Sequence, residues 1–508
     1  MRAPDAAGPR ASDDVLEIGG RLGEPPSQQL VATAFSDELE NQRELFYGVG
    51  LADLAHTLVM QGAGVVPKKA ARSLLSALLA LNEPAGSFDA DAAQGDLYTN
   101  REAWLQAHTD AAGWLGVSRA RREAITCGFH IAVRSDLLEL TDALCGLAGK
   151  MADLGRKHSS TLFPDYTYLQ AAQPTTFGHY LLGFAYPILR HLDRAGALYQ
   201  RFNLCPAGGG SANGSIAPQD RAKLARMMGF DGPVANTRDA MWQADLAIEA
   251  AGLVAGILVT LDRLGEDLMV YATQEFGLVR LGDRHSRASK IMPQKKNPFA
   301  LSYLRGIANQ AIGLQAAITA AMRTPSGQMD NRMAAYHEIP AALRQAAEAT
   351  RLMEEVLADL QIDTARAREI VEGSFLAASD LAEHIMLASD LDFRQAHKLV
   401  GALVRELESQ DKSLSDAEAQ DLDRIARAQL GRGLELDQEV IARALDPTRA
   451  VAARKCIGGA ARVQVKEAAG ALKKEIAEHR QAARKRRAKV ETAEHKLVER
   501  AREAARLA

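Results

Sequence analysis

Five long segments with the periodicity of helices occupy the middle of this chain and constrain its fold more than any other feature. Apolar residues recur in them at three- and four-residue spacing, and several segments exceed the length of an ordinary globular helix. The expected spans are 121–155, 174–202, 237–273, 295–322 and 335–360. The third span is apolar on nearly every side, as expected for a helix buried in a bundle or an oligomer. The sequence therefore predicts a bundle of long helices.

The composition supports a helical fold and disfavours other fold classes. The chain has 508 residues, of which 47% are hydrophobic and 25% charged, so it is long enough for about three domains with ordinary cores. Aromatic residues make up only 5%, whereas Ala and Leu are abundant, which favours helices. No β-hairpin signal and no alternation of strands with helices is present, which disfavours Rossmann and TIM-barrel folds. We predict an all-α fold.

Charge and cysteine content argue against several classes of partner. The 61 basic and 64 acidic residues leave a net charge of −3, which gives no overall reason to expect nucleic acid or a membrane as a partner. The four cysteines lie far apart and show no metal-ligand spacing. Neither a secretory signal nor an apolar run of about 20 residues is present, so a cytoplasmic location is expected.

The sequence divides into four expected parts. Residues 1–122 form an N-terminal helical domain, whose first 20 residues predict a mobile arm because they are rich in Pro, Gly, Ala and Asp. Residues 123–372 form the long-helix bundle, and residues 373–460 form a small C-terminal helical domain. Residues 461–508 form a charged helical tail with 14 Lys or Arg against 7 Asp or Glu. A solvated charged helix is favoured over a nucleic-acid patch, because no aromatic residues are interleaved with the charges.

The segment 282–298 carries the clearest chemical signal. It is a polar, proline-restricted loop in which the hydroxyl of Ser289 is close in sequence to Lys290, Lys295 and Lys296. Cations and free backbone N–H groups near the start of a helix favour anionic ligands. Judged by residue types alone, a carboxylate or phosphate site and a solvated basic loop both stay open.

The string SKIMPQKKNP, from Ser289 to Pro298, resembles the signature loop of the fumarase/aspartase superfamily. Its MPQKKNP part is most similar to the argininosuccinate lyases. Further segments resemble that family's motifs in the same order, namely RLGEPPS at 21–27, YTYLQAAQPTTFGH at 166–179, NTRDA at 236–240, a stretch at 381–402, and short matches at 445–447 and 458–460. Several matches in order are more specific than any one motif.

The resemblance implies a homotetramer with a helical core, whose active sites combine three segments from different subunits. It implies β-elimination from a succinyl-type dicarboxylate substrate to release fumarate, with no metal or organic cofactor. Ser289 matches the general base, and Lys295 matches a group that stabilises the aci-carboxylate. Thr167 and Tyr168 match the other catalytic positions. The resemblance places the following residues at the substrate: Asn297, Lys290 and Met292 of the loop, Arg119, Arg121, Arg122, Gln170 and Tyr98.

The expected chemistry accounts for these residue types. The carbon-bound proton is weakly acidic, so its removal needs preorganised donors and a cation that stabilise the carbanion as an aci-carboxylate. Serine is too weak a base unless positive surroundings favour the serinate, to which Lys290 or Lys295 would contribute.

Several positions depart from the family's motifs. Tyr168, Tyr98 and Gly116 stand where the family has histidines. Because a tyrosine has a pKa of about 10 in model peptides, Tyr168 would be a poor proton shuttle near neutral pH. Arg122 stands where the family has a carboxylate-binding Asn, and the segment 325–333 does not match the family's run whose Tyr and Gln would hold a guanidinium group.

These departures predict an elimination scaffold that acts on a substrate other than argininosuccinate, in a specialised pathway or in the addition direction. The two tyrosines are interpreted either as substrate ligands or as packing replacements after loss of function. The alternative hypotheses are a non-catalytic relative and an isomerase- or cyclase-like enzyme that uses the same scaffold.

Overall fold

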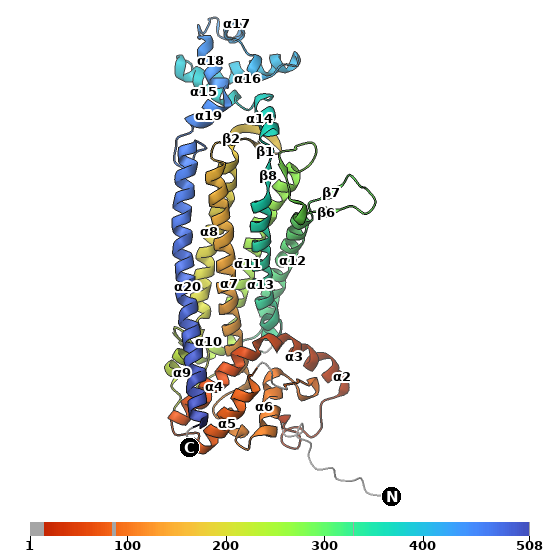
Figure 1. The fold of residues 1–508 in the computed structure, drawn as a ribbon, viewed down its shortest axis with the longest axis vertical. Helices are drawn as coiled ribbons and strands as arrows, with labels where there is room; N and C mark the ends of the chain where they lie inside the picture. Colours follow the sequence, from red (N-terminus) through yellow and green to blue (C-terminus); the bar gives the residue numbers. More distant parts are fainter. Residues whose placement is uncertain (1–14, 84–87, 329, 507–508) are drawn as a thin grey trace.

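The computed structural model describes residues 15–83, 88–328 and 330–506. Figure 1 shows an elongated molecule, in which a bundle of long helices joins a group of N-terminal helices at one end to a small helical unit at the other. The predicted all-α, three-part architecture is confirmed. The mobile arm predicted for residues 1–20 falls largely on residues 1–14, which lie outside the described residues.

The N-terminal helices form a compact group under the bundle. They are α2 (Gln28–Leu30), α3 (Ser36–Gln42), α4 (Phe46–Gly62), α5 (Lys68–Leu81) and α6 (Leu97–His108). α4 is almost wholly buried, and it meets the bundle where Gly48 faces Gly128. A Cβ on Gly48 would lie 2.8 Å from the Cα of Gly128, so only glycine allows this close approach. Asp96 caps α6, because its side chain accepts a hydrogen bond from the backbone N–H of Thr99.

The bundle contains the five long helices that the periodicity predicts. They are α7 (Arg121–Lys157), α8 (Phe177–Phe202), α11 (Asp245–Tyr271), α12 (Phe299–Met322) and α13 (Asp330–Asp359). The span predicted for 237–273 divides into a short α10 (Thr237–Trp242) and α11. The 37 residues of α7 extend over roughly 55 Å at 1.5 Å per residue. This length sets the distance between the two ends of the molecule.

A sixth long helix, α20 (Arg462–Arg506), returns from the small unit to the N-terminal end and packs along α7. Its buried residues recur at seven-residue spacing, as in a coiled-coil seam: Ala469, Ile476, Ala483, Val490 and Leu497. Its cations pair with acids of α7, as in the contacts of Arg487 with Glu139 and Asp142. One face of the basic tail thus packs against the bundle, and only its opposite face is solvated as expected.

The small unit has a core of its own. Its helices are α15 (Ala378–Ala388), α16 (Phe393–Ser409), α17 (Ala419–Leu430) and α18 (Gln438–Leu445), with α14 (Thr364–Glu372) and α19 (Pro447–Ala453) at its base. Arg454 attaches the unit to the bundle, because its guanidinium donates to Asp380 at 2.8 Å and to the carbonyl of Pro174 at 3.0 Å.

A β-hairpin at the upper end of the bundle corrects one sequence-based expectation. Strands β1 (Leu162–Thr167) and β2 (Gln170–Thr176) pair antiparallel, although no hairpin signal was expected. The turn residues Tyr168 and Leu169 lack the Gly and Asn signature of such turns, which hid the hairpin from sequence reasoning. Short pairs join β3 (Leu204–Cys205) with β4 (Gly232–Pro233), β5 (Val279–Arg280) with β8 (Gln361–Ile362), and β6 (Arg287–Ala288) with β7 (Lys296–Asn297).

A seven-residue helix, α9 (Arg221–Met227), lies near the lower end of α20. Among the described helices, none is both long enough and apolar enough to cross a membrane.

A buried histidine makes the stability of this fold dependent on pH. Burial lowers the pKa of His130 to about 4, and its Nδ1 lies 3.1 Å from the carbonyls of Phe202 and Leu204. Between pH 6.5 and 4 the unfolded chain binds the proton that the folded chain excludes, so stability falls as the pH falls. We expect His130→Gln to reduce this slope by up to about 1.4 kcal/mol per pH unit.

Urea unfolding between pH 7.5 and pH 5 measures the slope of the free energy of unfolding. His397→Gln, on an exposed position of α16, is the matched control. An unchanged slope in His130→Gln would contradict the assignment.

Candidate functional site

The segment 282–298 forms a loop closed at its neck by β6 and β7. Arg287 pairs with Asn297 and Ala288 pairs with Lys296 across this short ladder. The Asn297 amide donates to the carbonyl of Arg287 at 2.9 Å. Lys296 anchors the neck to the bundle, because its ammonium donates to the carbonyl of Leu281 at 2.7 Å and pairs with Asp283 at 2.6 Å. Two of the polar residues in the motif therefore hold the loop in shape.

Ser289 lies just beyond this neck in a tight turn. Its backbone N–H donates to the carbonyl of Lys295 at 3.2 Å. Its Oγ accepts the backbone N–H groups of Met292 at 3.0 Å and of Ile291 at 3.3 Å. Donors directed at an oxygen stabilise its negatively charged form. The loop backbone thus provides part of the environment that a serinate requires.

The remainder of the loop is open to solvent. Lys290 and Lys295 are exposed, as are Ile291 at 85% and Met292 at 40% of their full surface. In Figure 1 the loop projects from the side of the bundle. A substrate bound to Ser289 in one isolated chain would remain in contact with water.

The hairpin tip carries three further predicted site residues, Thr167, Tyr168 and Gln170, all of them exposed. Tyr168 is 99% exposed. Tyr168 and Leu169 have φ values of 55° and 57°, in the left-handed region that costs non-glycine residues about 1–3 kcal/mol each. Such strain is concentrated at functional sites. The hairpin and the signature loop lie toward the same end of the bundle, although no hydrogen bond among the described residues joins them.

The other predicted site residues lie at the opposite end of the bundle. Arg119, Arg121 and Arg122 are at the start of α7, whereas Thr167 follows its end. The length of α7 separates these groups by roughly 55 Å within one chain. One chain therefore does not bring all of the predicted site residues together.

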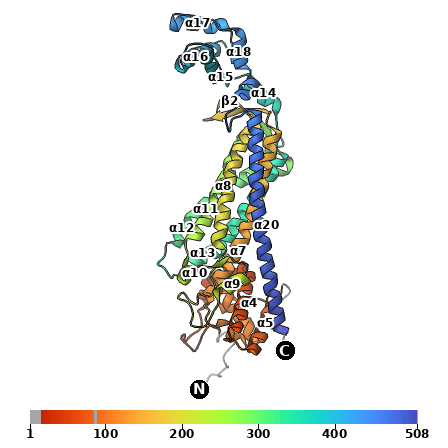
Figure 2. The same ribbon diagram turned by 90° about the vertical axis from the view of Figure 1, so that its left-hand side faces the viewer.

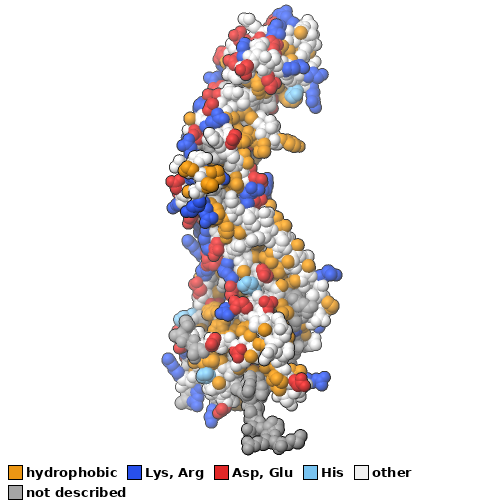
Figure 3. All heavy atoms as spheres, turned by 90° about the vertical axis from the view of Figure 1, so that its right-hand side faces the viewer, with side chains coloured by type: hydrophobic (Ala, Val, Ile, Leu, Met, Phe, Trp, Pro, Cys, Tyr) orange, Lys and Arg blue, Asp and Glu red, His pale blue; other side chains and the backbone are white. Residues whose placement is uncertain are grey.

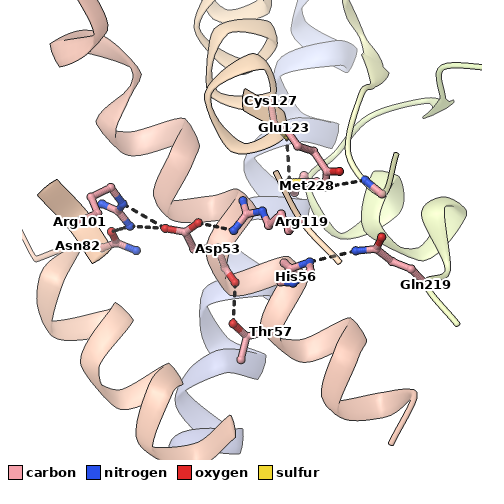
Figure 4. Close-up of polar contacts among 11 residues, drawn as sticks. Asp53, His56, Thr57, Asn82, Arg101, Arg119, Glu123, Cys127, Gln219 and Met228 are labelled. Carbon is pink, nitrogen blue, oxygen red and sulfur yellow. Dashed lines mark hydrogen bonds and ion pairs between the residues drawn. The ribbon is translucent and has the colours of Figure 1, made fainter. Parts of the chain in front are cut away.

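Arg119 and Tyr98 are enclosed in the N-terminal helices. Figure 4 shows Asp53 between two arginines. Arg119 contacts one carboxylate oxygen of Asp53 at 2.6 Å and Arg101 the other at 2.7 Å, and all three side chains are at most 1% exposed. The guanidinium of Arg119 lies 5.9 Å from the ring centre of Tyr98. Burial raises the pKa of Tyr98, so its hydroxyl stays protonated. Arg119 and Tyr98 thus lie within a buried charge cluster, and their predicted contact with substrate stays a prediction.

Arg121 and Arg122 line a small cavity of about 200 Å³ near the start of α7. The other polar side chains that line it are Glu38, Gln42, Asp96, Ser211 and Tyr336. Arg121 pairs with Asp96 at 3.2 Å, and Arg122 lies 4.0 Å above the ring of Trp242. Burial lowers the pKa of Arg122. The cavity offers both positive and negative groups to a polar ligand.

Two neighbours of this cavity were missed by sequence reasoning. Glu123 is buried, and its Oε1 accepts the backbone N–H of Gly208 at 2.8 Å, which fixes the Gly-rich loop beside α7 (Figure 4). Arg332 is 3% exposed and donates to the carbonyl of Met241 at 2.8 Å. Glu123 directly follows Arg121 and Arg122 in the sequence, and this position could have marked it as a neighbour of the site. For Arg332, the sequence gives no indication of burial beside the cavity except its place in the segment 325–333, which departs from the family's motif.

No group of three or more His, Cys, Asp or Glu side chains within the described ranges is arranged to hold a metal ion.

Comparison with known proteins places the chain in a family. The lyase family model matches residues 33–313, and the model of the argininosuccinate lyase C-terminal region matches residues 375–452. The argininosuccinate lyase of Methanococcoides burtonii is 30% identical over 449 residues, covering 88% of this chain and 90% of the relative. The chain belongs to the lyase family. It is an argininosuccinate lyase-like C–N lyase of the fumarase/aspartase superfamily.

Other relatives agree with this assignment. The argininosuccinate lyase of Methanoculleus marisnigri is 31% identical over 417 residues, covering 81% of this lyase and 83% of the relative. A variant of EDDS lyase with bound fumarate superposes with a TM-score of 0.87 at 26% identity, over 95% of this chain and 96% of that one. The 3-carboxy-cis,cis-muconate lactonizing enzyme of Pseudomonas putida shares the fold at 22% identity and a TM-score of 0.68, over 88% of this chain and 100% of its own.

The arrangement around Ser289 generates a direct prediction. We expect Ser289→Ala to lower kcat by roughly 10²–10⁴-fold, the usual contribution of a general base. Its thermal unfolding should be unchanged, because the hydroxyl bonds only within an exposed loop. Ser286→Ala, in the same loop, removes a hydroxyl that bonds to the carbonyl of Gly282 and is the control. Retained turnover in Ser289→Ala would show that another group is the base.

Proposed function

We propose that this lyase releases fumarate from a succinyl-type amine whose leaving group is not arginine. The main support is the turn at Ser289, where two backbone N–H groups are directed at Oγ within the family's signature loop. The EDDS lyase variant in the comparison binds fumarate, which agrees with a four-carbon dicarboxylate product.

The proposed elimination proceeds in two chemical steps. Ser289, as the serinate, removes a proton from the carbon next to a substrate carboxylate, and the electron pair moves into that carboxylate. Lys295, on the exposed side of the same turn, is the cation that stabilises the resulting charge. The pair then returns to form the double bond of fumarate while the C–N bond breaks. The departing amine takes its proton from Tyr168 or from water, and Asn297 and Gln170 position the acid end.

We propose that the site is completed by other copies of the chain in a homotetramer. Ser289 and the Arg121–Arg122 cavity lie at opposite ends of one bundle, so a second chain packed antiparallel would bring its cavity to the first chain's loop. α12 presents Tyr303 and Ile312 to solvent at 47% and 51% exposure. Figure 3 looks onto this side, where hydrophobic and uncharged side chains cover much of the middle of the bundle. Such a face suits a helical interface between subunits.

The leaving amine is inferred from the substitutions near the cavity. A guanidinium group needs acceptors, yet Asp96 of the cavity already pairs with Arg121, and Arg122 and Arg332 bring further cations to this region. Residues 325–333 also do not match the family's run that supplies a Tyr and a Gln to this group. The charge of Arg122 and its neighbours disfavours a second cation there. The lyase scaffold would therefore accept an amine that is neutral or carries an additional acidic group.

A substrate panel tests this function. Purified lyase is mixed with argininosuccinate, N-succinyl amines and N-succinyl amino acids, and fumarate is followed by its ultraviolet absorbance. We expect release from at least one member other than argininosuccinate, and the reverse addition reaction with fumarate and the same amine. Efficient release from argininosuccinate would overturn the altered leaving group. No release from any member, and no addition, would favour the non-catalytic or isomerase-like alternative.

A further inference from the structure

A second polar groove lies away from the proposed active site, between α9 and the lower half of α20. Figure 2 shows these two helices next to each other near the C-terminal end of the chain. The groove has a volume of about 900 Å³. It lies on the side of the bundle opposite α12, so the proposed subunit interface leaves it accessible (Figure 1).

The lining of this groove is strongly basic. Its charged residues are Lys223 and Arg226 from α9, Lys489, Lys496 and Arg500 from α20, and a single acid, Asp231. Asp231 already pairs with Lys489. No carboxylate in the described part of the chain forms an ion pair with the other four cations.

This excess contrasts with two paired cations higher on α20. Higher on the same helix, Lys473 pairs with Asp153, and Arg487 pairs with two acids of α7. A concave surface lined by one sign of charge concentrates the field and attracts ions of the opposite sign. The groove therefore attracts an anion, whereas Lys473 and Arg487 are each paired with acids of α7.

The spacing of the cations indicates an anion with several charges. Lys489, Lys496 and Arg500 are seven and four residues apart, so they lie on one face of α20 and extend over roughly 16 Å. Lys223 and Arg226 face them from α9. A single phosphate would contact only part of this array, whereas a chain of phosphates reaches both walls.

The groove offers little that would recognise an aromatic base. Its single aromatic residue, Phe230, is 1% exposed and lies 4.4 Å beneath the guanidinium of Arg134. Gly229, at φ +78°, allows α9 to approach α20, because a Cβ there would lie 3.1 Å from the Cα of Val490. Stacking of successive bases, on which single-stranded nucleic acids depend, has no platform here.

We propose that the groove between α9 and α20 is a binding site for a di- or triphosphate group, either inorganic or attached to a nucleotide. The phosphates are bound by four cations that do not contact the base, namely Lys223, Arg226, Lys496 and Arg500. This site uses none of the residues of the proposed elimination, so a test of phosphate binding is independent of a test of the proposed function.

Isothermal titration of the full-length protein with inorganic triphosphate, ATP and orthophosphate, without divalent cations, tests the site. We expect saturable binding of triphosphate and ATP with similar affinity, weaker binding of orthophosphate, and loss of affinity as salt is raised. Binding of ATP more than tenfold tighter than triphosphate would overturn the claim that the base is ignored. No saturable binding of either at low salt would overturn the site.

Charge-matched variants locate the binding. The double variant Lys496→Gln/Arg500→Gln should weaken triphosphate binding at least tenfold, and Lys223→Gln/Arg226→Gln should do the same from the opposite wall. Arg484→Gln/Lys485→Gln removes the same charge from an exposed part of α20 outside the groove, and its affinity should stay within twofold of the parent. Equal weakening in all three would show general charge attraction and contradict a defined site. Far-ultraviolet circular dichroism confirms that each variant is folded.

Discussion

The rigidity of one helix determines how this lyase can work. α7 holds the Arg121–Arg122 cavity and the β1–β2 hairpin at its two ends, roughly 55 Å apart, and it cannot bend to bring them together. The surrounding helices pack along this axis, and α20 adds a coiled-coil seam with a set of ion pairs. Within one chain, a bundle of this length keeps the predicted site residues apart. The proposed assembly with other copies would bring these residues together.

The two segments proposed to carry the catalytic residues, the signature loop and the hairpin, are preorganised in different ways. The signature loop is closed by Asn297 and anchored by Lys296, which leaves Ser289 in a turn with its oxygen already bonded to two N–H groups. The hairpin instead holds Tyr168 in the left-handed conformation that its two-residue turn requires. A partner surface over both segments would exclude water and strengthen the charge interactions between them.

Sequence reasoning predicted the long helices well, because their periodicity is local and repeated. The hairpin at 162–176 was missed, because Tyr168 and Leu169 are not residues typical of a tight turn. Their positive φ values are stabilised by the surrounding fold rather than by their own residue types. The seven-residue spacing from Ala469 to Leu497 is visible in the sequence, but its partner is α7, more than 300 residues away, so only the fold shows what it packs against. Family motifs located Ser289 and Arg119 equally well. Only the structure shows that Ser289 is half-buried on a projecting loop whereas Arg119 is enclosed with Asp53.

A mixing experiment with two variants tests the shared site most directly. Ser289→Ala and Arg122→Ala, each impaired alone, are unfolded together in equal amounts and refolded. If the two groups act from different chains, random assembly restores up to about a quarter of the parent activity, because that fraction of sites receives both intact residues. Activity no higher than that of the two variants refolded separately would contradict a site shared between chains.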